Sequence, residues 1–211
     1  MPPLFGHGGP KTERVARFLK RRGRAAPGLR PALDCRSFPR LFRKRAIVFT
    51  DTTSFTVHTA RYGILHCLTV FDRLFRAAGP PVRKLGGQIL KMEGDSLLMR
   101  FDDVAAACRS VVALEACLRR LNRGKPESER LALSYGIGYG DVVDTEEDVF
   151  GLEVNIASRL GEDVARPGEV LLTPAAAAAL PKAVLRRVVP YKVFTFEKHA
   201  LPIQRLKLRG R

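Results

Sequence analysis

Two aspartates, Asp51 and Asp95, stand where carboxylates could act together. Asp51 follows the apolar run 46–49, and Asp95 lies in a Gly-Asp turn between two segments with strand character. Two carboxylates that converge with no basic residue immediately beside either repel each other, and Mg²⁺ would relieve the repulsion because hard cations bind oxygen ligands. The alternative is structural, since an Asp that closes a strand and an Asp in a turn are both common. These two residues alone leave both interpretations open.

A polar pair follows later in the chain. Asn155 and Arg159 are four positions apart in a segment, 151–164, that has helical periodicity, so they share one helix face. A guanidinium stays ionised and offers several donors to phosphate oxygens, which makes Arg159 a candidate phosphate ligand. Taken alone, the pair could equally be exposed polar residues on an amphipathic helix, and Lys91 could be an exposed strand lysine.

The elements that must position these residues alternate between strand and helix. The spacing predicts an α+β sandwich of the ferredoxin-like kind, with helices covering one face of a mainly antiparallel sheet. In such a sheet the first strand is central and lies beside the hairpin, so Asp51 and Asp95 can reach the same edge. The glycines of the strand around residues 136–140 indicate close packing. We predict strands at 46–49, 82–93, 96–101, 131–143, 169–172 and 184–196, and helices at 55–78 (ended by Gly79-Pro80-Pro81), 102–122 and 151–164.

Composition is that of a soluble globular protein. The 211 residues are 45% hydrophobic and 27% charged, enough for one domain and a tail. No apolar run approaches the roughly 20 residues of a membrane-spanning helix, and the opening segment lacks a secretory signal, so we expect a cytoplasmic protein. The four cysteines have neither zinc spacing nor a disulfide pattern, and we expect buried free thiols.

The positive charge is concentrated at the N-terminus. Residues 1–44 contain 12 Lys and Arg against 2 Asp and Glu, within a chain of net charge +16. Prolines predict a linker over residues 23–43. We therefore divide the chain into a basic, flexible arm (1–44), a folded domain (45–196) and a basic tail (197–211). The arm could be a solvated extension, or it could bind an anionic membrane surface, a regulatory partner or nucleic acid.

Three sequence blocks resemble those of the class III adenylate and guanylate cyclase catalytic domains. Residues 49–56 (FTDTTSFT) are similar to the family's opening FTDxxGFT block, and residues 91–101 resemble its Gly-Asp hairpin. Residues 148–160 (DVFGLEVNIASRL) match the pattern DxxGxxVNxAxRL. The blocks occur in family order with matching internal spacing over most of the chain.

The resemblance implies a metal site and a reaction. Asp51, Asp95 and the backbone carbonyl of Thr52 would hold two Mg²⁺ or Mn²⁺ ions. ATP would be converted to 3′,5′-cyclic AMP and pyrophosphate by in-line attack of the ribose 3′-hydroxyl on the α-phosphate. Ser54 replaces the usual glycine and could crowd the triphosphate loop.

The resemblance also assigns the remaining polar residues. Lys91 and Asp148 take the purine-reading positions, where lysine donates to adenine N1 and aspartate accepts from the 6-amino group. Guanine would mismatch both contacts, so the pair favours ATP. Asn155 would orient the ribose, and Arg159 would stabilise phosphate charge in the transition state.

The family builds each site from two subunits, which implies a head-to-tail homodimer with shared active sites. A guanylate cyclase is the alternative within the class, although Lys91 and Asp148 argue against it. A non-catalytic nucleotide-binding regulatory domain is a second alternative. A nucleic-acid-binding domain fits poorly, because residues 91–101 have a single aromatic residue.

Overall fold

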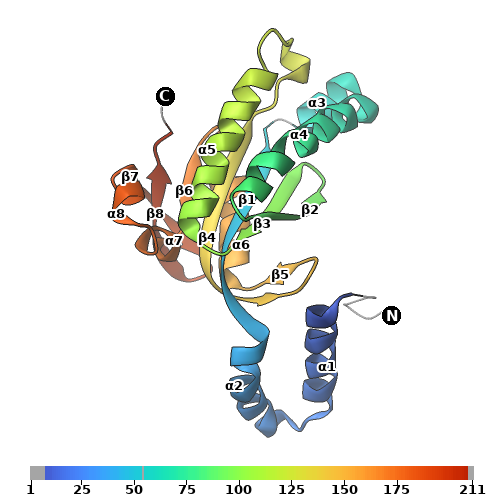
Figure 1. Ribbon diagram of the computed structural model, residues 1–211, viewed down its shortest axis with the longest axis vertical. Helices are drawn as coiled ribbons and strands as arrows, with labels where there is room; N and C mark the ends of the chain where they lie inside the picture. Colours follow the sequence, from blue (N-terminus) through green and yellow to red (C-terminus); the bar gives the residue numbers. More distant parts are fainter. Residues whose placement is uncertain (1–7, 54, 209–211) are drawn as a thin grey trace.

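The computed structural model describes residues 8–53 and 55–208, which form a twisted sheet, flanking helices and a projecting N-terminal arm (Figure 1). Within these residues the sheet has eight strands in the order β2-β3-β1-β4-β6-β8-β7, with β5 paired to β4. The paired strands are antiparallel except β4 and β6. The strands are β1 (Phe42–Thr52), β2 (Gln88–Glu93), β3 (Ser96–Phe101), β4 (Leu133–Asp144), β5 (Val149–Phe150), β6 (Val170–Leu172), β7 (Val188–Phe196) and β8 (His199–Leu206).

Helices occupy the connections between the strands and the arm. They are α1 (Pro10–Arg24), α2 (Arg30–Leu41), α3 (Phe55–Tyr62), α4 (Ile64–Lys84), α5 (Val104–Leu121), α6 (Leu152–Arg159), α7 (Pro174–Ala178) and α8 (Lys182–Leu185), with short 3₁₀ turns η1 (Pro27–Leu29) and η2 (Glu127–Glu129) and a π-helical turn η3 (Leu160–Val164).

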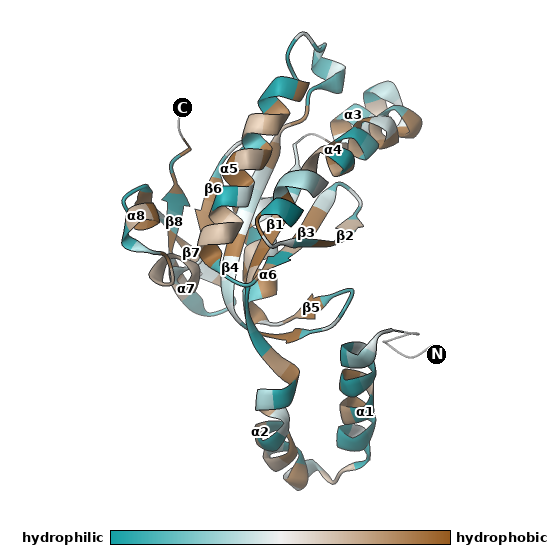
Figure 2. Ribbon diagram, viewed as in Figure 1, coloured by the Kyte–Doolittle hydropathy of each residue, from teal (hydrophilic) through white to brown (hydrophobic). Residues whose placement is uncertain are grey.

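The main core lies between one face of the sheet and helices α4, α5 and α7 (Figure 2). Alternate residues of β1, such as Ala46 and Val48, point into this core, because successive strand residues face opposite sides. Ile47 and Phe49 face the other way and pack with Ala157 of α6. The predicted α+β class is confirmed, but the expectation of helices on one face only is corrected, since α6 covers part of the second face.

Glycines in β4 let α6 lie directly on the sheet. A Cβ atom at Gly136 would stand 1.9 Å from the carbonyl oxygen of Ala157, and one at Gly138 would stand 2.5 Å from that of Glu153. These distances are far below van der Waals contact, so only glycine permits this approach. The close packing expected around residues 136–140 is therefore present.

The first long helix differs from its prediction. Gly63, with φ of 84°, separates α3 from α4, and α4 continues through Gly79-Pro80-Pro81 to Lys84. Ala78, Gly79 and Val82 are buried on this stretch, so core packing outweighs the local cost of proline in the helix. Strand β2 consequently starts at Gln88 rather than at residue 82.

Both ends of the chain are more regular than predicted. The linker expected over residues 23–43 contains helix α2, because Pro31 lies in its first turn, where a missing N–H removes no helical hydrogen bond. The tail expected after residue 196 instead forms β8, which pairs with β6 and β7 inside the sheet. In the described part of the chain no helix combines the length and apolarity needed to cross a bilayer.

Candidate active site

The end of β1 and the β2–β3 turn meet at one edge of the sheet. Thr50 pairs with Leu97 in the β1–β3 ladder, and its hydroxyl accepts a hydrogen bond from the Leu97 amide at 3.1 Å. One step further along, the Thr52 hydroxyl donates to the Asp95 carbonyl oxygen at 2.7 Å. These bonds fix the turn against the strand end, and they place Asp51 and Asp95 next to each other as their sequence positions predicted.

The surroundings of both carboxylates disfavour their ionised forms. Burial raises the pKa of Asp51 to about 6, and the charges of Asp95 and Glu162 add to the shift. The pKa of Asp95 is also raised, mainly by burial. Since an uncompensated carboxylate pair is unfavourable, a bound cation would stabilise the ionised forms.

The donor set suits a hard divalent cation. Asp51 and Asp95 supply carboxylate oxygens, and backbone carbonyls lie along the same strand end. Among residues 8–53 and 55–208, no group of three or more His, Cys, Asp or Glu side chains forms a ready-made metal cage. Two carboxylates fit Mg²⁺ or Mn²⁺, because such ions commonly take further ligands from water and substrate phosphates.

Sequence reasoning missed Glu162. This residue lies in the π-helical turn η3, which continues α6 toward the carboxylate pair. Burial raises the pKa of Glu162, and the charges of Asp163 and Asp95 act in the same direction. Its position three residues after Arg159 is a signal that could have drawn attention to it. The charge of a third carboxylate therefore acts on the candidate metal ligands.

Lys91 and Asp148 meet directly. Lys91 Nζ lies 2.9 Å from Asp148 Oδ2 and 2.6 Å from Glu93 Oε1. Although burial opposes ionisation of Lys91, its hydrogen bonds with Glu93 and Asp148 raise its pKa. Lys91 thus remains a cation with two carboxylate partners.

A β-bulge turns Lys91 toward Asp148. Ile89 pairs with Met99, whereas Lys91 pairs with Leu98, so Leu90 is the extra residue in β2. Without the bulge Lys91 would pair with Leu97, which faces the main core. The bulge instead places Lys91 beside Leu98, on the face of the sheet that α6 covers.

Several solved structures of nucleotidyl cyclases have the same architecture. An adenylate/guanylate cyclase/hydrolase from Silicibacter pomeroyi has a TM-score of 0.67 and 24% identity, covering 78% of this chain and 96% of its own. The guanylyl cyclase Cya2 has a TM-score of 0.69 and 22% identity, covering 80% and 94%. An adenylate cyclase from Trypanosoma brucei in its monomeric state has a TM-score of 0.67 and 22% identity, covering 80% and 91%.

This chain has the class III nucleotidyl cyclase fold. Curated relatives include a putative adenylate cyclase 3 from Rhizobium meliloti, 33% identical over 41% of this chain and 15% of its own length. An adenylate cyclase from Streptomyces coelicolor is 30% identical over 56% of this chain and 29% of its own. A serine/threonine-protein kinase, pkn2, from Myxococcus xanthus is 28% identical over 65% of this chain and 16% of its own.

The cyclase domain spans less than a third of the length of each of these curated relatives. No protein-family model matches the chain. The fold and the relatives named adenylate cyclase nevertheless confirm the resemblance inferred from the three sequence blocks.

Within the cyclase domain the remaining polar pair lies on the outer side of α6. Asn155 and Arg159 are exposed, and Arg159 Nη1 lies 2.8 Å from Asp163 Oδ2 on the next helical turn. The pair shares one helix face as predicted, and the Arg159 side chain is 58% exposed. Ser54, which departs from the family pattern, lies outside the described residues.

Proposed function

We propose that this chain is an adenylate cyclase that converts ATP to 3′,5′-cyclic AMP and pyrophosphate. One observation carries the proposal: two partly buried carboxylates, Asp51 and Asp95, converge at a sheet edge where burial raises the pKa of both and the charge of Asp95 adds to the shift at Asp51. The cyclase fold and the relatives named adenylate cyclase support this assignment.

Asp51, Asp95 and the Thr52 carbonyl would hold two Mg²⁺ or Mn²⁺ ions. When bound, such ions lower the pKa of the ribose 3′-hydroxyl and offset charge on the departing pyrophosphate. The chain's own residues fix this edge of the sheet, because the hydrogen bond from the Thr52 hydroxyl to the Asp95 carbonyl oxygen ties the hairpin turn to the end of β1. In-line displacement by the 3′-oxygen then needs no nucleophilic side chain from the protein.

Selectivity for ATP follows from the Lys91–Asp148 pair. Lys91 is a donor that matches adenine N1, and Asp148 is an acceptor that matches the 6-amino group. Guanine presents a donor at N1 and an acceptor at O6, so both contacts fail and leave polar groups unpaired. The ionised pair at 2.9 Å supports this role, since both groups already lie within reach of one planar ligand edge.

Arg159 and Asn155 would act in trans. Their exposed position on α6 supports a head-to-tail homodimer in which each subunit offers them to its partner's metal edge. In that arrangement Asn155 orients the ribose, and Arg159 leaves its ion pair with Asp163 to bind the phosphates. A guanidinium suits this exchange because it stays ionised and binds phosphate through several donors.

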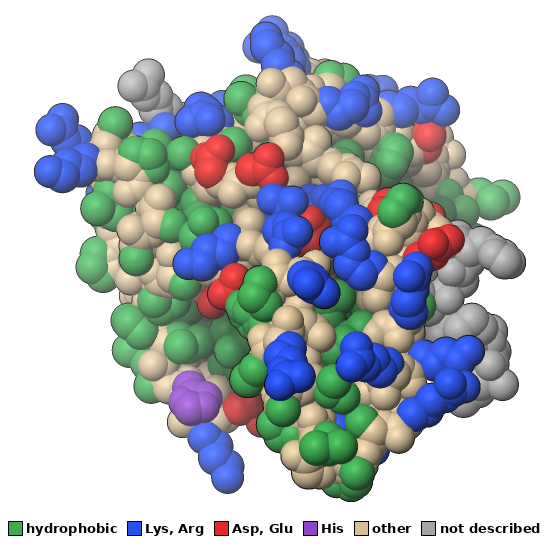
Figure 3. Space-filling model, turned by 60° about the horizontal axis from the view of Figure 1, so that its bottom comes forward, with side chains coloured by type: hydrophobic (Ala, Val, Ile, Leu, Met, Phe, Trp, Pro, Cys, Tyr) green, Lys and Arg blue, Asp and Glu red, His purple; other side chains and the backbone are tan. Residues whose placement is uncertain are grey.

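The N-terminal arm would bring the enzyme to an anionic membrane surface. Figure 3 shows many Lys and Arg side chains spread over this face of the molecule, with a smaller number of Asp and Glu side chains among them. Arg14, Arg17, Lys20, Arg21 and Arg24 of α1 are all exposed. Sedimentation with vesicles containing phosphatidylserine, compared with neutral vesicles, tests this peripheral association.

The activity is tested by incubating the purified chain with ATP or GTP and either metal, and by measuring both cyclic nucleotides. Cyclic AMP should form faster than cyclic GMP, and Asp51→Asn should reduce the rate at least about a hundredfold. Asp141→Asn is the matched control, because Asp141 is an exposed strand aspartate away from this edge. Preferential cyclic GMP formation would favour a guanylate cyclase, and nucleotide binding without product would favour a regulatory domain.

A further inference from the structure

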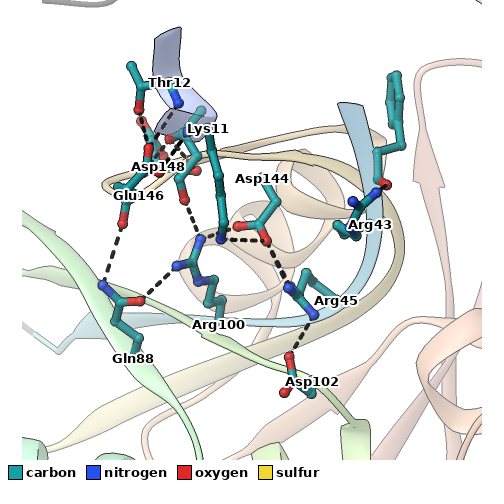
Figure 4. Close-up of polar contacts among 12 residues, drawn as sticks. Lys11, Thr12, Arg43, Arg45, Gln88, Arg100, Asp102, Asp144, Glu146 and Asp148 are labelled. Atoms are coloured by element: carbon teal, nitrogen blue, oxygen red, sulfur yellow. Dashed lines mark hydrogen bonds and ion pairs between the residues drawn. The ribbon is translucent and has the colours of Figure 1, made fainter. Parts of the chain in front are cut away.

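We propose that helix α1 is a specificity element of the active site, because its first turn holds the loop that presents Asp148. The inference rests on the proposed function, since it assigns Asp148 to the purine. It adds three positioning residues, Glu146, Thr12 and Asp144. The helix and the loop lie more than a hundred positions apart in sequence, yet they are in direct contact (Figure 4).

Glu146 caps α1 from outside the helix. Its carboxylate accepts hydrogen bonds from the Lys11 amide at 2.8 Å, the Thr12 amide at 2.9 Å and the Thr12 hydroxyl at 2.7 Å. The N-cap residue, Gly9, makes no side-chain capping bond. First-turn amides have no partner within their helix, so Glu146 supplies one and also meets the positive end of the helix dipole.

These contacts shift the pKa of Glu146. Burial opposes the charge, but the Thr12 hydroxyl and the Lys11 and Thr12 amides outweigh it and lower the pKa of Glu146 to about 2. Thr12 itself is only 6% exposed. The junction is therefore a specific, partly buried contact, unlike a chance meeting of surface groups.

A buried aspartate anchors the start of the same loop. Asp144, whose side chain is fully buried, pairs with Arg45 Nη2 at 2.9 Å, with Lys11 Nζ at 3.5 Å and with Arg100. Arg100 also donates to the carbonyl of Thr145. Three cations from α1, β1 and β3 thus converge on one carboxylate and fix the residue from which the loop leaves β4.

The loop is also tied to β2, the strand that contains Lys91. Arg100 Nη2 donates to Gln88 Oε1 at 2.8 Å, and Gln88 Nε2 donates to the Glu146 carbonyl oxygen at 3.4 Å. Figure 4 shows Gln88 between Arg100 and Glu146. A shift of the loop would therefore also disturb the strand that positions Lys91.

Inside the loop, Thr145 and Asp148 close a tight turn. The Thr145 amide and hydroxyl donate to the Asp148 carbonyl at 3.0 Å and 2.8 Å, and the Asp148 amide donates to the Thr145 hydroxyl at 2.9 Å. Fixing Thr145 and Glu146 therefore fixes the backbone of Asp148. Hydrogen bonds tie α1 to Glu146, the backbone joins Glu146 to this turn, and an ion pair joins Asp148 to Lys91.

A purely structural role for this junction makes a different prediction. If α1 only adds stability, loss of the Glu146 charge lowers the melting temperature and leaves nucleotide preference unchanged. If α1 positions the loop, ATP loses affinity while GTP, which already mismatches Asp148, loses little. The ratio of the two affinities separates these cases, and a stability measurement alone does not.

The test compares Glu146→Gln with Glu147→Gln in the full chain. Glu147 is the exposed neighbour on the same loop, so its variant matches the charge change without touching α1. Hydrogen exchange is measured over residues 10–24 and 144–150. Dissociation constants for ATP and GTP are measured with Mn²⁺ by competition against a fluorescent nucleotide, and Glu146→Asp is included as the conservative variant.

Glu146→Gln should speed exchange in both segments and weaken ATP binding about five- to tenfold, with less than about a twofold change for GTP. Glu147→Gln should change neither, and Glu146→Asp should recover part of the ATP preference. Unchanged exchange, or faster exchange with an unchanged ATP-to-GTP ratio, would overturn the inference. If the wild-type chain binds neither nucleotide, the proposed function fails, and the inference falls with it. If the wild type prefers ATP and the Glu146→Gln variant keeps that preference, only the inference about α1 fails and the proposed function stands.

Discussion

Lys91 Nζ lies 2.9 Å from Asp148 Oδ2, although the two residues are 57 positions apart. The bulge in β2 and the turn closed by Thr145 bring them together. Each residue alone is a common surface charge, whereas the pair offers one donor and one acceptor to the edge of a purine. This relationship leads to the first prediction.

Replacing the pair should change the preferred nucleotide. In the double variant Lys91→Glu, Asp148→Cys, the glutamate accepts from guanine N1–H and the aspartate no longer repels guanine O6. We expect the ratio of kcat/KM for ATP to that for GTP to fall about a hundredfold. Lys84→Glu is the control for the charge change at Lys91, because Lys84 is exposed at the end of α4. An equal effect of Lys84→Glu would rule out direct purine reading by Lys91.

The stability of the protein should depend on the charge of Asp51. Its pKa is about 6 in the folded chain and 3.8 ordinarily, so folding favours the protonated form. The resulting stabilisation is complete below pH 3.8 and is lost as the pH rises to about 6. In the absence of divalent cations, Asp51→Asn should therefore be more stable than wild type at pH 7.5. Because Asp51 is only partly buried and solvent screens its charge, we expect a gain on the order of 1 kcal/mol.

Thermal unfolding of the two proteins between pH 3.5 and 7.5 measures this effect. The difference in Tm should be near zero at the acid end and should grow through pH 4 to 6. Asp141→Asn should show no comparable trend. A constant difference across the range would mean that Asp51 is not held in a charge-disfavouring site.

Two inactive variants should complement each other. In the proposed shared-site homodimer, Asp51→Ala would remove a metal ligand and Arg159→Ala would remove the guanidinium, so each variant's homodimer would lack activity at both sites. A mixed dimer would retain one intact site, and we expect equimolar mixing to restore up to about a quarter of the wild-type rate, since half of the dimers are mixed and each has one of two sites. If mixed dimers form and no activity returns, the shared-site arrangement is wrong.

The packing of α6 on the sheet should be intolerant of a single methyl group. Gly136→Ala would place Cβ 1.9 Å from the Ala157 carbonyl oxygen, and only a backbone shift can relieve this contact. We expect a loss of about 2–4 kcal/mol in the free energy of unfolding by urea. Gly23→Ala is the matched control, since a Cβ atom there meets nothing within 4 Å and α1 should gain slightly. Equal stability of the two variants would contradict the close packing of α6.

The order of strands and helices along the chain could be predicted from local pattern, and the meeting of Asp51 with Asp95 from the ferredoxin-like topology that this order indicates. A run such as 46–49 predicts a buried strand, and a Gly-Asp turn predicts a hairpin. Once the first strand is central, its end and the hairpin turn reach the same edge. The register that pairs Thr50 with Leu97 was not predicted and is read from the structure.

Other features depend on contacts that pattern does not contain. The bulge at Leu90 changes the face of Lys91, and no residue type in β2 marks it. Helix α4 continues through Pro80 and Pro81 because its buried side chains outweigh the helix-breaking tendency. Helix α1 docks through Glu146, whose partners are more than 130 positions away in sequence. Local pattern does not contain this contact, and the prolines around α2 therefore suggested a linker.

The central claim is that Asp51 and Asp95 together bind divalent cations that a triphosphate also contacts. Electron paramagnetic resonance titration of Mn²⁺ with 3′-deoxy-ATP, which cannot cyclise, measures this binding directly. We predict tight Mn²⁺ binding that requires the nucleotide, a loss of at least about tenfold in affinity for Asp51→Asn and for Asp95→Asn, and no change for Asp141→Asn. Mn²⁺ binding of equal strength in the wild type and in both variants would contradict the account.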